Sequence, residues 1–390
     1  MSKLDELIAE LCPDGVEYKT LGTICEIRSG WGFPNIEQGK TSGDYPFYKV
    51  GDMNSFGNEF VMTVANNYVD LETATRLRCK PAPKGTVIFP KIGAAIGTNK
   101  KRILAQEACY DNNIIGLIPS DAVISRYLFY QMEAVNLMRF ADYSGAMPSI
   151  RKTTLEKFRI PVPPLPVQQE IVRILDNFTE LTAELTAELT ARRKQYEYYR
   201  KILIKNSNNI RQYSLGELAT LKTGSKPKDV FEFPHKYEYI NAGTTNSGYT
   251  DKANCDGDTV TTPSRGQGGI GFVGYQYDPF WLGPLCYRIK SRNDKIVTNR
   301  YLFYYLSCFN EKILAYKKEG GTPSVNASDL VNIIVDVPPL TEQKRIVAIL
   351  DRFDALCNDL TSGIPAEIEA RQKQYEYYRD KLLSFKGLGV

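Results

Sequence analysis

Two basic, glycine-rich segments carry side chains suited to contacting a polynucleotide. The first is Lys91-Ile-Gly-Ala-Ala-Ile-Gly97, followed by Asn99-Lys-Lys-Arg102, and its counterpart is Ser264-Arg-Gly-Gln-Gly-Gly-Ile-Gly271. Glycine lets backbone amides approach phosphate, while Lys, Arg and Gln side chains can reach base edges. We therefore predict DNA contact at both segments; the alternative is an ordinary hairpin with a solvated basic face. The candidate residues are Lys91, Asn99, Lys100, Lys101, Arg102, Arg265 and Gln267.

Other basic side chains are further candidates for the same contact. Arg151 and Lys152 follow Pro148-Ser149 and could hold a phosphate, or they could be solvated surface charges. The remaining candidates follow Leu-Gly pairs that occur in both halves of the chain, and they are Arg28 (near Trp31), Lys222, Lys226 and Lys228.

Motifs that would indicate catalysis or a metal site are missing from the sequence. It contains no Asn-Pro-Pro-Tyr or Asp-Pro-Pro-Tyr tetrapeptide of an amino-methyltransferase. Gly269-x-Gly271-x-x-Gly274 matches a dinucleotide-binding motif by letter, but neither a strand before it nor a helix after it is expected. The single histidine and eight scattered cysteines give no metal-ligand spacing. We predict that the chain binds a ligand, and assign it neither catalytic nor metal-binding residues.

A long internal repeat organises the chain. Ala191–Arg200 matches Ala370–Arg379 at nine of ten positions, and both segments contain Gln-Tyr-Glu-Tyr-Tyr-Arg. Upstream, a Val-Pro-Pro-Leu junction occurs twice, as does an Arg-Tyr-Leu-Phe-Tyr segment beginning at Arg126 and Arg300. The offset between the copies grows from 175 to 179, so the second copy carries four extra residues, which we place near 362–365. The repeat predicts two related domains with pseudo-two-fold symmetry.

Each proline junction is followed by a long helical pattern. Apolar residues alternate at spacings of three and four, as in a coiled-coil seam. Gly363 and Pro365 should kink or interrupt the second helix. A helix of ~40 residues would be roughly 60 Å long, more than one domain needs, so we predict a spacer; the alternative is that the helices only form core. The seam residues are Ile171, Phe178, Leu181, Leu185, Leu189, Phe353, Leu356 and Leu360.

Between the helices lie two segments that mix strand-like and helix-like runs. Residues 86–89, 113–118 and 332–337 are typical of strands, and 126–139 and 300–312 of helices. The predicted class is α+β (or α/β), with two globular domains separated by two long antiparallel coiled-coil helices. The predicted boundaries are 1–158 (first domain with an N-terminal helix), 159–206 (central helix), 207–333 (second domain) and 334–390 (C-terminal helix).

The composition agrees with a folded protein of this size. The 390 residues suffice for two or three domains, and 43% of them are hydrophobic. A net charge of +4 permits a nucleic-acid partner without requiring one. The acidic start is atypical of a signal peptide, and no apolar run is long enough to cross a membrane. We expect reduced cysteines and a cytoplasmic protein.

These features together resemble the specificity subunit of Type I restriction–modification systems. The resemblance covers essentially the whole chain: a globular segment, a Pro-Pro-Leu junction and a helix ending in Gln-Tyr-Glu-Tyr-Tyr-Arg, all twice. The run Thr182-Ala-Glu-Leu-Thr-Ala-Glu-Leu189 looks like the Thr-Ala-Glu-Leu repeat of one Type I subgroup, in which the repeat number sets the gap between half-sites. The alternative for this run is a plain heptad stutter.

The resemblance implies a DNA-binding role inside a larger complex. Each globular segment would be a target-recognition domain that reads one half of a bipartite, asymmetric double-stranded DNA sequence. The helices would hold the domains apart and dock two methyltransferase subunits, and endonuclease/translocase subunits would complete the complex. S-adenosylmethionine, ATP and Mg²⁺ would bind to those partners and not to this chain. The setting would be the bacterial or archaeal cytoplasm, close to the nucleoid.

The tyrosines at the helix ends are candidates for partner contact. They offer aromatic surface on more faces than one seam can bury. We predict contact with a methyltransferase subunit; the alternative is packing against the chain's own globular domains. The residues are Tyr196, Tyr198, Tyr199, Tyr375, Tyr377 and Tyr378.

The sequence leaves two rival functions open. A fused restriction–methylation enzyme would need a methyltransferase motif and several hundred more residues than the chain has. A coiled-coil adaptor that binds only proteins is the alternative, and DNA binding would distinguish it. Readers about one helical turn (~10 base pairs) apart on DNA, each reading roughly 3–4 pairs, would leave a gap of roughly 6–7 pairs.

Overall fold

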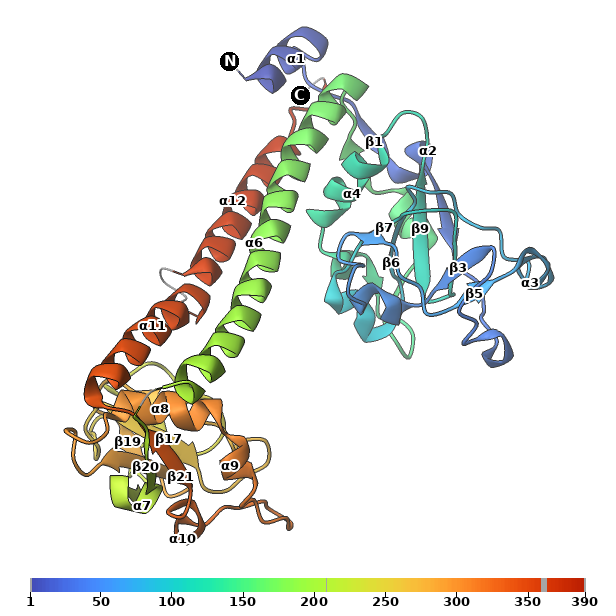
Figure 1. Ribbon diagram of the computed structural model, residues 1–390. Helices are drawn as coiled ribbons and strands as arrows, with labels where there is room; N and C mark the ends of the chain where they lie inside the picture. The colour runs from blue at the N-terminus through green and yellow to red at the C-terminus, as the bar shows by residue number, and fades with distance from the viewer. Residues whose placement is uncertain (1, 208, 359–362, 389–390) are drawn as a thin grey trace. The chain divides into compact units, whose positions relative to one another are not determined.

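The chain folds into two compact units, and each is described by itself. The computed structural model describes residues 2–207, 209–358 and 363–388. Unit 1 comprises Met1–Glu184 with Glu369–Val390, and unit 2 comprises Leu185–Ile368. Each unit combines one globular segment with parts of the long helices, and both mix helices and sheets (Figure 1), which confirms the predicted α+β class.

Unit 1 is built on three small sheets and a strand pair that joins its ends. The sheets have the orders β2-β9-β6-β7-β4, β5-β3-β8 and β10-β11, and β1 pairs with β12. Its strands are β1 Tyr18–Thr20, β2 Cys25–Ser29, β3 Tyr45–Tyr48, β4 Val61–Met62, β5 Tyr68–Val69, β6 Val87–Pro90, β7 Arg102–Leu104, β8 Cys109–Tyr110, β9 Ile114–Pro119, β10 Ala141–Asp142, β11 Ser149–Ile150 and β12 Arg159–Pro161. Its shorter helices are α1 Lys3–Leu11, α2 Leu21–Ile24, α3 Leu71–Arg76, α4 Ser125–Glu133 and α5 Lys152–Glu156, with 3-10 turns η1 Asn35–Glu37, η2 Val50–Asn54, η3 Gly93–Thr98 and η4 Leu137–Phe140.

Unit 2 repeats this plan with fewer strands. Its sheets have the orders β14-β20-β17-β18 and β16-β15-β19, and β13 pairs with β21. Its strands are β13 Arg211–Ser214, β14 Ala219–Thr223, β15 Tyr237–Ile240, β16 Tyr249–Thr250, β17 Thr259–Pro263, β18 Gly274–Gln276, β19 Trp281–Leu282, β20 Cys286–Ser291 and β21 Ile334–Val337. Its shorter helices are α7 Leu215–Leu218, α8 Asn299–Cys308, α9 Glu311–Leu314 and α10 Ala327–Leu330.

The two units share a strand order that the sequence did not reveal. The antiparallel run β2-β9-β6-β7 corresponds to β14-β20-β17-β18. Each three-stranded sheet combines one antiparallel pair (β3 with β5, β15 with β16) and one parallel pair (β3 with β8, β15 with β19). The duplication therefore extends into the globular segments, whose sequences differ widely.

The repeated glutamines explain why the proline junctions are preserved. Gln168 donates from Nε2 to the carbonyl of Pro163 (2.8 Å) and accepts at Oε1 from the amide of Ile124 (2.9 Å). Gln343 makes the corresponding bonds to Pro338 (2.9 Å) and from Thr298 (3.0 Å). Both glutamines are fully buried. A buried amide with its hydrogen bonds satisfied fixes the chain where it enters the long helix.

The repeated glycines Gly30 and Gly224 mark close backbone contacts. A Cβ at Gly30 would lie 2.0 Å from the carbonyl oxygen of Asp111. A Cβ at Gly224 would lie 1.8 Å from the carbonyl oxygen of Leu282. No larger residue fits either position without moving the backbone. These two glycines therefore keep a corresponding strand end close-packed in both units.

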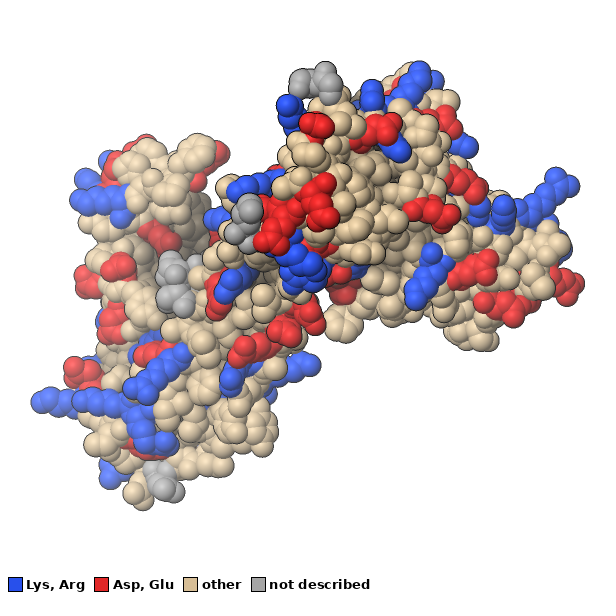
Figure 2. All heavy atoms as spheres, turned by 90° about the horizontal axis from the view of Figure 1, so that it is seen from above, with Lys and Arg blue, Asp and Glu red and all other residues tan. Residues whose placement is uncertain are grey.

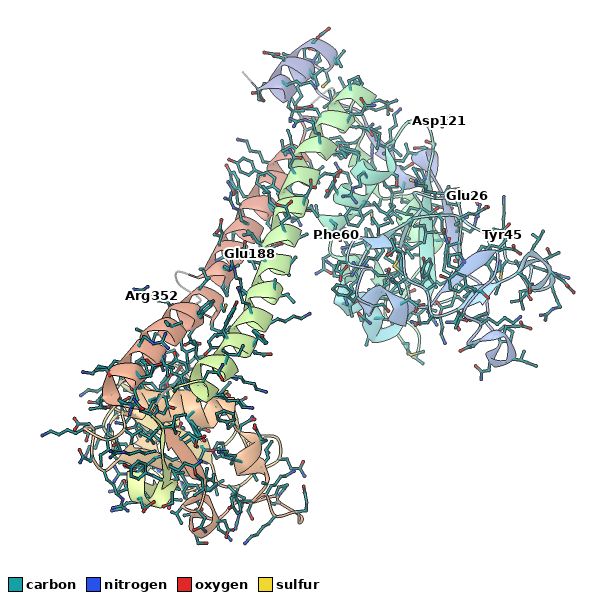
Figure 3. The ribbon with its side chains drawn as sticks, in the orientation of Figure 1. Glu26, Tyr45, Phe60, Asp121, Glu188 and Arg352 are labelled. Atoms are coloured by element: carbon teal, nitrogen blue, oxygen red, sulfur yellow. The ribbon has the colours of Figure 1, made fainter. Side chains whose placement is uncertain are left out.

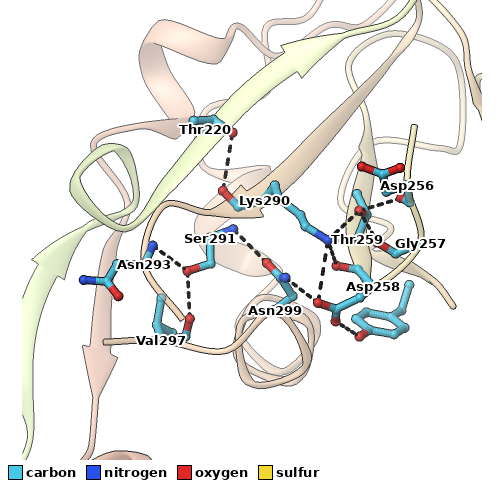
Figure 4. Close-up of polar contacts among 11 residues, drawn as sticks. Thr220, Asp256, Gly257, Asp258, Thr259, Lys290, Ser291, Asn293, Val297 and Asn299 are labelled. Carbon is cyan, nitrogen blue, oxygen red and sulfur yellow. Dashed lines mark hydrogen bonds and ion pairs between the residues drawn. The ribbon is translucent and has the colours of Figure 1, made fainter. Parts of the chain in front are cut away.

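A polar network in unit 2 ties the start of α8 to its main sheet (Figure 4). Lys290 of β20 donates from Nζ to the carbonyls of Gly257 (2.8 Å) and Asp258 (2.6 Å). Asn299 donates from Nδ2 to Oδ2 of Asp258 (2.7 Å) and accepts at Oδ1 from the amide of Ser291 (2.7 Å). Because Asn299 bonds to both the strand and the preceding loop, it sets the position at which α8 begins.

The long helices have the predicted length and interruption. Helix α6 spans Leu165–Lys205, 41 residues, or about 60 Å at ~1.5 Å per residue. Helix α11 spans Leu340–Asn358 and α12 spans Ile364–Leu382, so the second helical pattern is divided as predicted near Gly363. Within unit 1, α12 packs on α6 through stacked Phe178 and Tyr378 (5.5 Å between ring centroids). Within unit 2, α11 packs on α6 through Tyr196 and Phe353 (6.2 Å).

The seam prediction is right at the helix starts and wrong toward the middle. Ile171 is fully buried, whereas Leu181 is 47% exposed and Leu356 is 40% exposed. Cys357 is buried in place of Leu356, and its carbonyl accepts a hydrogen bond from Arg193 of α6 (3.3 Å). After Phe353, the next residue on the buried face of α11 is therefore four positions later (Cys357) and not three (Leu356). Leu185 and Leu189 are half-buried, and Leu360 lies outside the described residues.

Polar side chains dominate α6 where the seam weakens. Glu188 (labelled in Figure 3) forms an ion pair with Arg192 one turn later, at 3.5 Å. Exposed ion pairs of this spacing stabilise a helix by only about 0.3–0.5 kcal/mol. The Thr-Ala-Glu-Leu segment is therefore a largely solvated stretch of a continuous helix.

All eight cysteines are free and buried. Burial raises the pKa of Cys25 and that of Cys286 to about 12, so both remain thiols at neutral pH. In the part of the chain that the structure describes, no helix is both long and apolar enough to cross a membrane.

Candidate nucleic-acid interface

The glycine-rich segment of unit 1 lies against the Pro-Ser segment that follows η4. It continues β6 and turns into η3 at Gly93, which has a φ of 71°. The amide of Gly93 donates to the carbonyl of Pro148 (2.8 Å), and the amide of Ile150 donates to the carbonyl of Lys91 (2.8 Å). These two bonds join segments that are far apart in the sequence into one surface.

The glycine-rich segment of unit 2 makes the same two contacts. The amide of Gly266, with a φ of 130°, donates to the carbonyl of Pro323 (3.1 Å). The amide of Val325 donates to the carbonyl of Ser264 (2.9 Å). The two glycine-rich segments are therefore counterparts, as predicted, and each is hydrogen-bonded through its backbone to its own copy of the Pro-Ser repeat. Residue by residue, Arg265 stands where unit 1 has Ile92.

The side chains on these matching surfaces differ. In unit 2, Arg265 and Gln267 are exposed, and neither makes an ion pair or side-chain hydrogen bond to a described residue. In unit 1, Tyr143 (63%) and Met147 (62%) are the exposed side chains beside Arg151. Arg151 pairs with Asp142 and donates to Ser144 Oγ (3.1 Å), so its guanidinium is held in place. The same backbone arrangement thus carries polar, basic side chains in unit 2 and large apolar or aromatic ones in unit 1.

Lys101 was predicted to contact DNA, and its position rules this out. Its side chain is fully buried and donates from Nζ to the carbonyl of Val135 (2.7 Å) and to Oδ1 of Asn99 (2.9 Å). Burial lowers the pKa of Lys101 to about 8. Asn99, with a φ of 55°, ends η3 and accepts a second hydrogen bond from the amide of Leu137 (2.8 Å). These two residues hold η4 against the glycine-rich segment; Asn99 is half-buried, and its contact with DNA stays a prediction.

Two predicted arginines have the same kind of internal role. Arg28 is 11% exposed, pairs with Glu26 and donates from Nη1 to the carbonyl of Pro81 (3.1 Å). Arg102 donates from Nη1 to the carbonyl of Lys101 (2.7 Å) and from Nη2 to that of Met53 (3.1 Å). An arginine whose N–H groups donate to carbonyls of its own chain holds loops together. It has few N–H donors free to bind a phosphate.

The remaining candidates lie at the surface. Lys91 is half-buried and donates to Ser29 Oγ (3.0 Å), and Lys100 donates to Asn54 Oδ1. Lys152 is exposed and lies 3.7 Å from Glu156. Exposed lysines without an ion pair to a described residue occur on and just after β14, and they are Lys222, Lys226 and Lys228. The structure therefore does not bring all the basic candidates together, and they remain predictions.

Positive charge does not form one continuous stripe on the face drawn in Figure 2. Lys and Arg side chains alternate there with Asp and Glu. On this face, mixed charge weakens the non-specific attraction to phosphate. The distribution is consistent with a net charge of only +4.

A pocket lies beside the glycine-rich segment of unit 2, and it was not predicted from the sequence. It has a volume of about 240 Å³ and is lined by Thr244, Thr245, Asn246, Thr261 and Gln276, among others. Its edge touches the segment, because a Cβ on Gly269 would lie 3.0 Å from the amide nitrogen of Gly243. Amide and hydroxyl groups are the side chains that read base edges. These polar residues come from a loop and from strands β17 and β18, and they form no sequence pattern, so no signal was available to find them.

The tyrosine clusters divide into buried and exposed members. Tyr196 and Tyr375 are each 8% exposed and belong to the cores of unit 2 and unit 1 respectively. Partner contact was predicted for both, and that prediction is wrong for these two because they pack against their own units. The exposed members are Tyr198 (63%), Tyr199 (42%), Tyr377 (63%) and Tyr378 (37%).

Comparison with known proteins identifies the family. The family model for the Type I restriction modification DNA specificity domain matches residues 13–192 and again 208–370. The EcoR124I/EcoR124II specificity subunit of Escherichia coli is 33% identical over 286 residues, which cover 67% of this chain and 70% of that one. The MpnII specificity subunit of Mycoplasma pneumoniae is 27% identical over 318 residues, covering 63% and 94%.

Solved structures share the fold. A Type I restriction–modification S subunit from M. genitalium superposes with a TM-score of 0.62 at 17% identity, covering 95% of this chain and 96% of that chain. A chain from a study of assembly and conformational transition in the type I R-M system gives a TM-score of 0.60 at 16% identity, covering 96% and 98%. The family match excludes the alternative of an adaptor without DNA specificity. The chain therefore belongs to the DNA specificity subunits of Type I restriction–modification systems, the non-catalytic components that recognise the DNA target.

Proposed function

We propose that each unit reads one half of a bipartite, asymmetric DNA sequence through its glycine-rich segment and the Pro-Ser segment beside it. The observation that carries the proposal is the pair of matching backbone contacts, Gly93 to Pro148 and Gly266 to Pro323. A shared scaffold with unlike exposed side chains is what two related readers of different sequences require. Base contacts specify a sequence, whereas backbone contacts position the protein.

The pocket lined by Thr261 and Gln276 extends the reading surface of unit 2. An amide such as Gln276 can pair with adenine in a bidentate manner, and Gln267 offers a second amide nearby in sequence. Arg265 is suited to guanine, the commonest specific contact of arginine. Unit 1 offers instead Tyr143 and Met147 beside Arg151, which favours apolar contacts with base methyl groups or sugars.

Helix α6 sets the gap between the half-sites in this proposal. It contributes to both units without interruption, from Leu165 to Lys205. A gap of roughly 6–7 base pairs follows if the readers engage DNA about one helical turn apart. The Thr-Ala-Glu-Leu repeat inside α6 is the segment whose length tunes that gap.

Two methyltransferase subunits and endonuclease/translocase subunits are the proposed partners. The exposed aromatic side chains Tyr198, Tyr199, Tyr377 and Tyr378 provide surface for docking a protein. S-adenosylmethionine, ATP and Mg²⁺ would be bound by those partners. The complex would work where DNA is found, in the cytoplasm at the nucleoid.

Sequencing of DNA modification tests the proposal directly. The chain is expressed with its cognate methyltransferase subunit in a host that lacks Type I methylation. We expect methylated adenine in one split motif, with the same motif protected from the complete restriction complex. An Arg265→Ala, Gln267→Ala variant is expected to relax one half of the motif and leave the other half unchanged. Methylation without a split motif would overturn the proposal.

A further inference from the structure

Unit 2 buries two polar atoms that have no hydrogen-bond partner among the described residues. They are Nε of Arg200, at the end of the repeated tyrosine signature, and Oγ of Ser307, on α8. Buried donors are almost always satisfied, so an unsatisfied pair in one place needs an explanation. Leaving a buried donor unpaired costs about 1–3 kcal/mol.

Both residues line the same groove. One lobe of about 390 Å³ is lined by Arg200 and Ser307 together with Lys194, Tyr198 and Lys201. An adjoining lobe of about 260 Å³ again includes Arg200 and Ser307. The guanidinium of Arg200 lies over the ring of Tyr196, with 5.4 Å between Cζ and the ring centroid. This contact uses the face of the guanidinium and does not use the N–H groups along its edge. The groove is thus a surface depression with an arginine in its wall.

Three acidic residues line the groove, and none of them forms an ion pair with Arg200 among the residues that the structure describes. Asp354 lines the second lobe, but it is 3.7 Å from Arg300 and accepts a hydrogen bond from Asn358 (2.9 Å). Glu197 and Glu311 are exposed, and neither forms an ion pair with Arg200 in the described part of the chain. Unit 2 therefore offers Arg200 no carboxylate of its own.

In unit 1, the corresponding arginine is paired with a carboxylate of its own unit. Arg379 is the counterpart of Arg200 and lies over Tyr375 at 5.8 Å, as Arg200 does over Tyr196. Its Nε and Nη2 donate to Oδ1 of Asp380 (2.9 and 2.8 Å). At the counterpart of Ser307 stands Glu133, whose pKa is raised because its burial outweighs the opposing effect of the charges of Lys101, Arg102 and Arg379.

The two acidic residues of unit 1 are replaced in unit 2. Asp380 corresponds to Lys201, and Glu133 corresponds to Ser307. The first change reverses a charge and the second removes one, so Arg379 of unit 1 has an ion pair with Asp380, whereas Arg200 has no ion pair with a described residue. Because the tyrosine signature itself is identical, the difference arises from the residues around it, which include these two positions.

We propose that Arg200, Lys201 and Ser307 form a binding site for a carboxylate of a methyltransferase subunit, present in unit 2 and absent in unit 1. The inference rests on the proposed function and adds that two copies of one partner dock unequally. The guanidinium of Arg200 can bind a carboxylate through charge-assisted hydrogen bonds. Ser307 lines both lobes beside Arg200, and a small side-chain rotation would bring its hydroxyl to the ligand as a further donor.

A protein carboxylate fits this groove better than a DNA phosphate. Tyr198 lines the groove and is 63% exposed, and the next residue, Tyr199, is 42% exposed. Tyrosine and arginine in a shared depression are typical of the residues that dominate protein–protein affinity. Glu197 and Glu311 also line the groove, and their charges repel a chain of phosphates more strongly than a single carboxylate.

The test substitutes the residue of one unit into the other. Lys201 is exposed, so Lys201→Asp should fold, and it supplies Arg200 with the carboxylate that Arg379 has in unit 1. Native mass spectrometry and calorimetry with the cognate methyltransferase subunit should show two sites of unequal affinity for the wild type. In Lys201→Asp the tighter site should weaken by at least about tenfold, leaving two similar sites.

Two control variants separate this effect from a change in net charge. Lys295→Asp changes the charge by the same amount at an exposed position of unit 2, in the loop before α8, and should leave both affinities unchanged. Asp380→Lys makes the reverse exchange in unit 1 and should strengthen the weaker site. Equal sites in the wild type, or unchanged affinities in Lys201→Asp, would overturn the inference and leave the proposed function standing. A loss of DNA affinity in Lys201→Asp with unchanged partner affinity would instead assign the groove to phosphate. If the wild type binds no methyltransferase subunit, both proposals fail.

Discussion

The hydroxyl of Tyr304 donates a 2.6 Å hydrogen bond to Oδ1 of Asp351, which joins α8 to α11 within unit 2. Arg300 donates to the same oxygen from Nε at 2.8 Å. In unit 1, Tyr130 and Arg126 contact Asp176 in the same way, with the arginine Nε at 2.9 Å. The repeated Arg-Tyr-Leu-Phe-Tyr motif therefore fastens each globular segment to a long helix.

Replacing Asp351 by Asn should destabilise unit 2 by about 1–3 kcal/mol. Arg300 is only 12% exposed, so the substitution leaves a largely buried guanidinium without its main anion. Urea unfolding followed by tyrosine fluorescence should show a lower midpoint. Asp278→Asn, at an exposed position, is the matched control and should change the midpoint little. An unchanged midpoint in Asp351→Asn would mean that the aromatic rings around Arg300 suffice to hold it.

Stability at low pH should depend on Glu170. Its side chain is 4% exposed and lies 2.6 Å from Arg173 and 3.1 Å from Lys3, and the hydrogen bond from Arg173 is the main reason why its pKa falls to about 2. A depressed carboxyl pKa stabilises the fold above the unfolded value of about 4.3, and this contribution is lost as the pH falls toward 2. Between pH 5 and pH 3, the wild type should lose about 1 kcal/mol more than Glu170→Gln, after allowance for the exposed cations. Parallel losses in thermal melts of the two proteins would contradict this assignment.

Substitutions of Arg265 and Gln267 should weaken DNA binding, whereas a substitution of Lys101 should not. Arg265→Ala should weaken specific binding by about 1–3 kcal/mol and relax the preference at one base pair, since a bidentate contact is lost. Lys101→Met should leave the slope of affinity against salt unchanged, because a buried ammonium releases no DNA counterions. Titrations at several salt concentrations measure both quantities on the assembled methyltransferase. A reduced slope in Lys101→Met would show that the residue reaches the DNA after all.

Inserting one more Thr-Ala-Glu-Leu unit after Leu189 should lengthen the gap by one base pair and keep both half-sites. Four residues add ~400° of helical rotation, a net ~40° at ~3.6 residues per turn, close to the twist of about 35° per base pair. The added ~6 Å exceeds one base-pair rise of ~3.4 Å, so tilt or DNA deformation must absorb the rest. A three-residue insertion rotates the helix by ~300° and should abolish methylation. Methylome sequencing distinguishes these results, and changed half-sites would contradict the division of labour between helix and globular segments.

The sequence predicted the framework well because the framework is periodic or repeated. Helix α6, the break near Gly363 and the pairing of the two glycine-rich segments all follow from patterns within one chain. The common strand order of the units was not predicted, because strands of two to six residues leave almost no hydrophobic period.

The reading surface was predicted less well for a different reason. Lys101 and Lys100 are neighbours of the same type, yet one is fully buried and the other is half-buried at the surface. Likewise Tyr196 packs in a core and Tyr198, two residues later on the same helix, is 63% exposed. Residue type cannot separate such pairs, because tertiary contacts decide which side of a helix or turn faces inward. The polar lining of the pocket near Gln276 depends wholly on how loops fold over β17 and β18.

The burial of the cysteines makes this protein convenient for site-directed spectroscopy. All eight thiols of the sequence lie among the described residues and are shielded from solvent. A single cysteine introduced at an exposed position such as Tyr198 or Lys222 would therefore react with a maleimide or nitroxide well before any native thiol. Pairs of such labels, one in each unit, would report in solution how the distance between the two readers changes when DNA or a methyltransferase subunit binds.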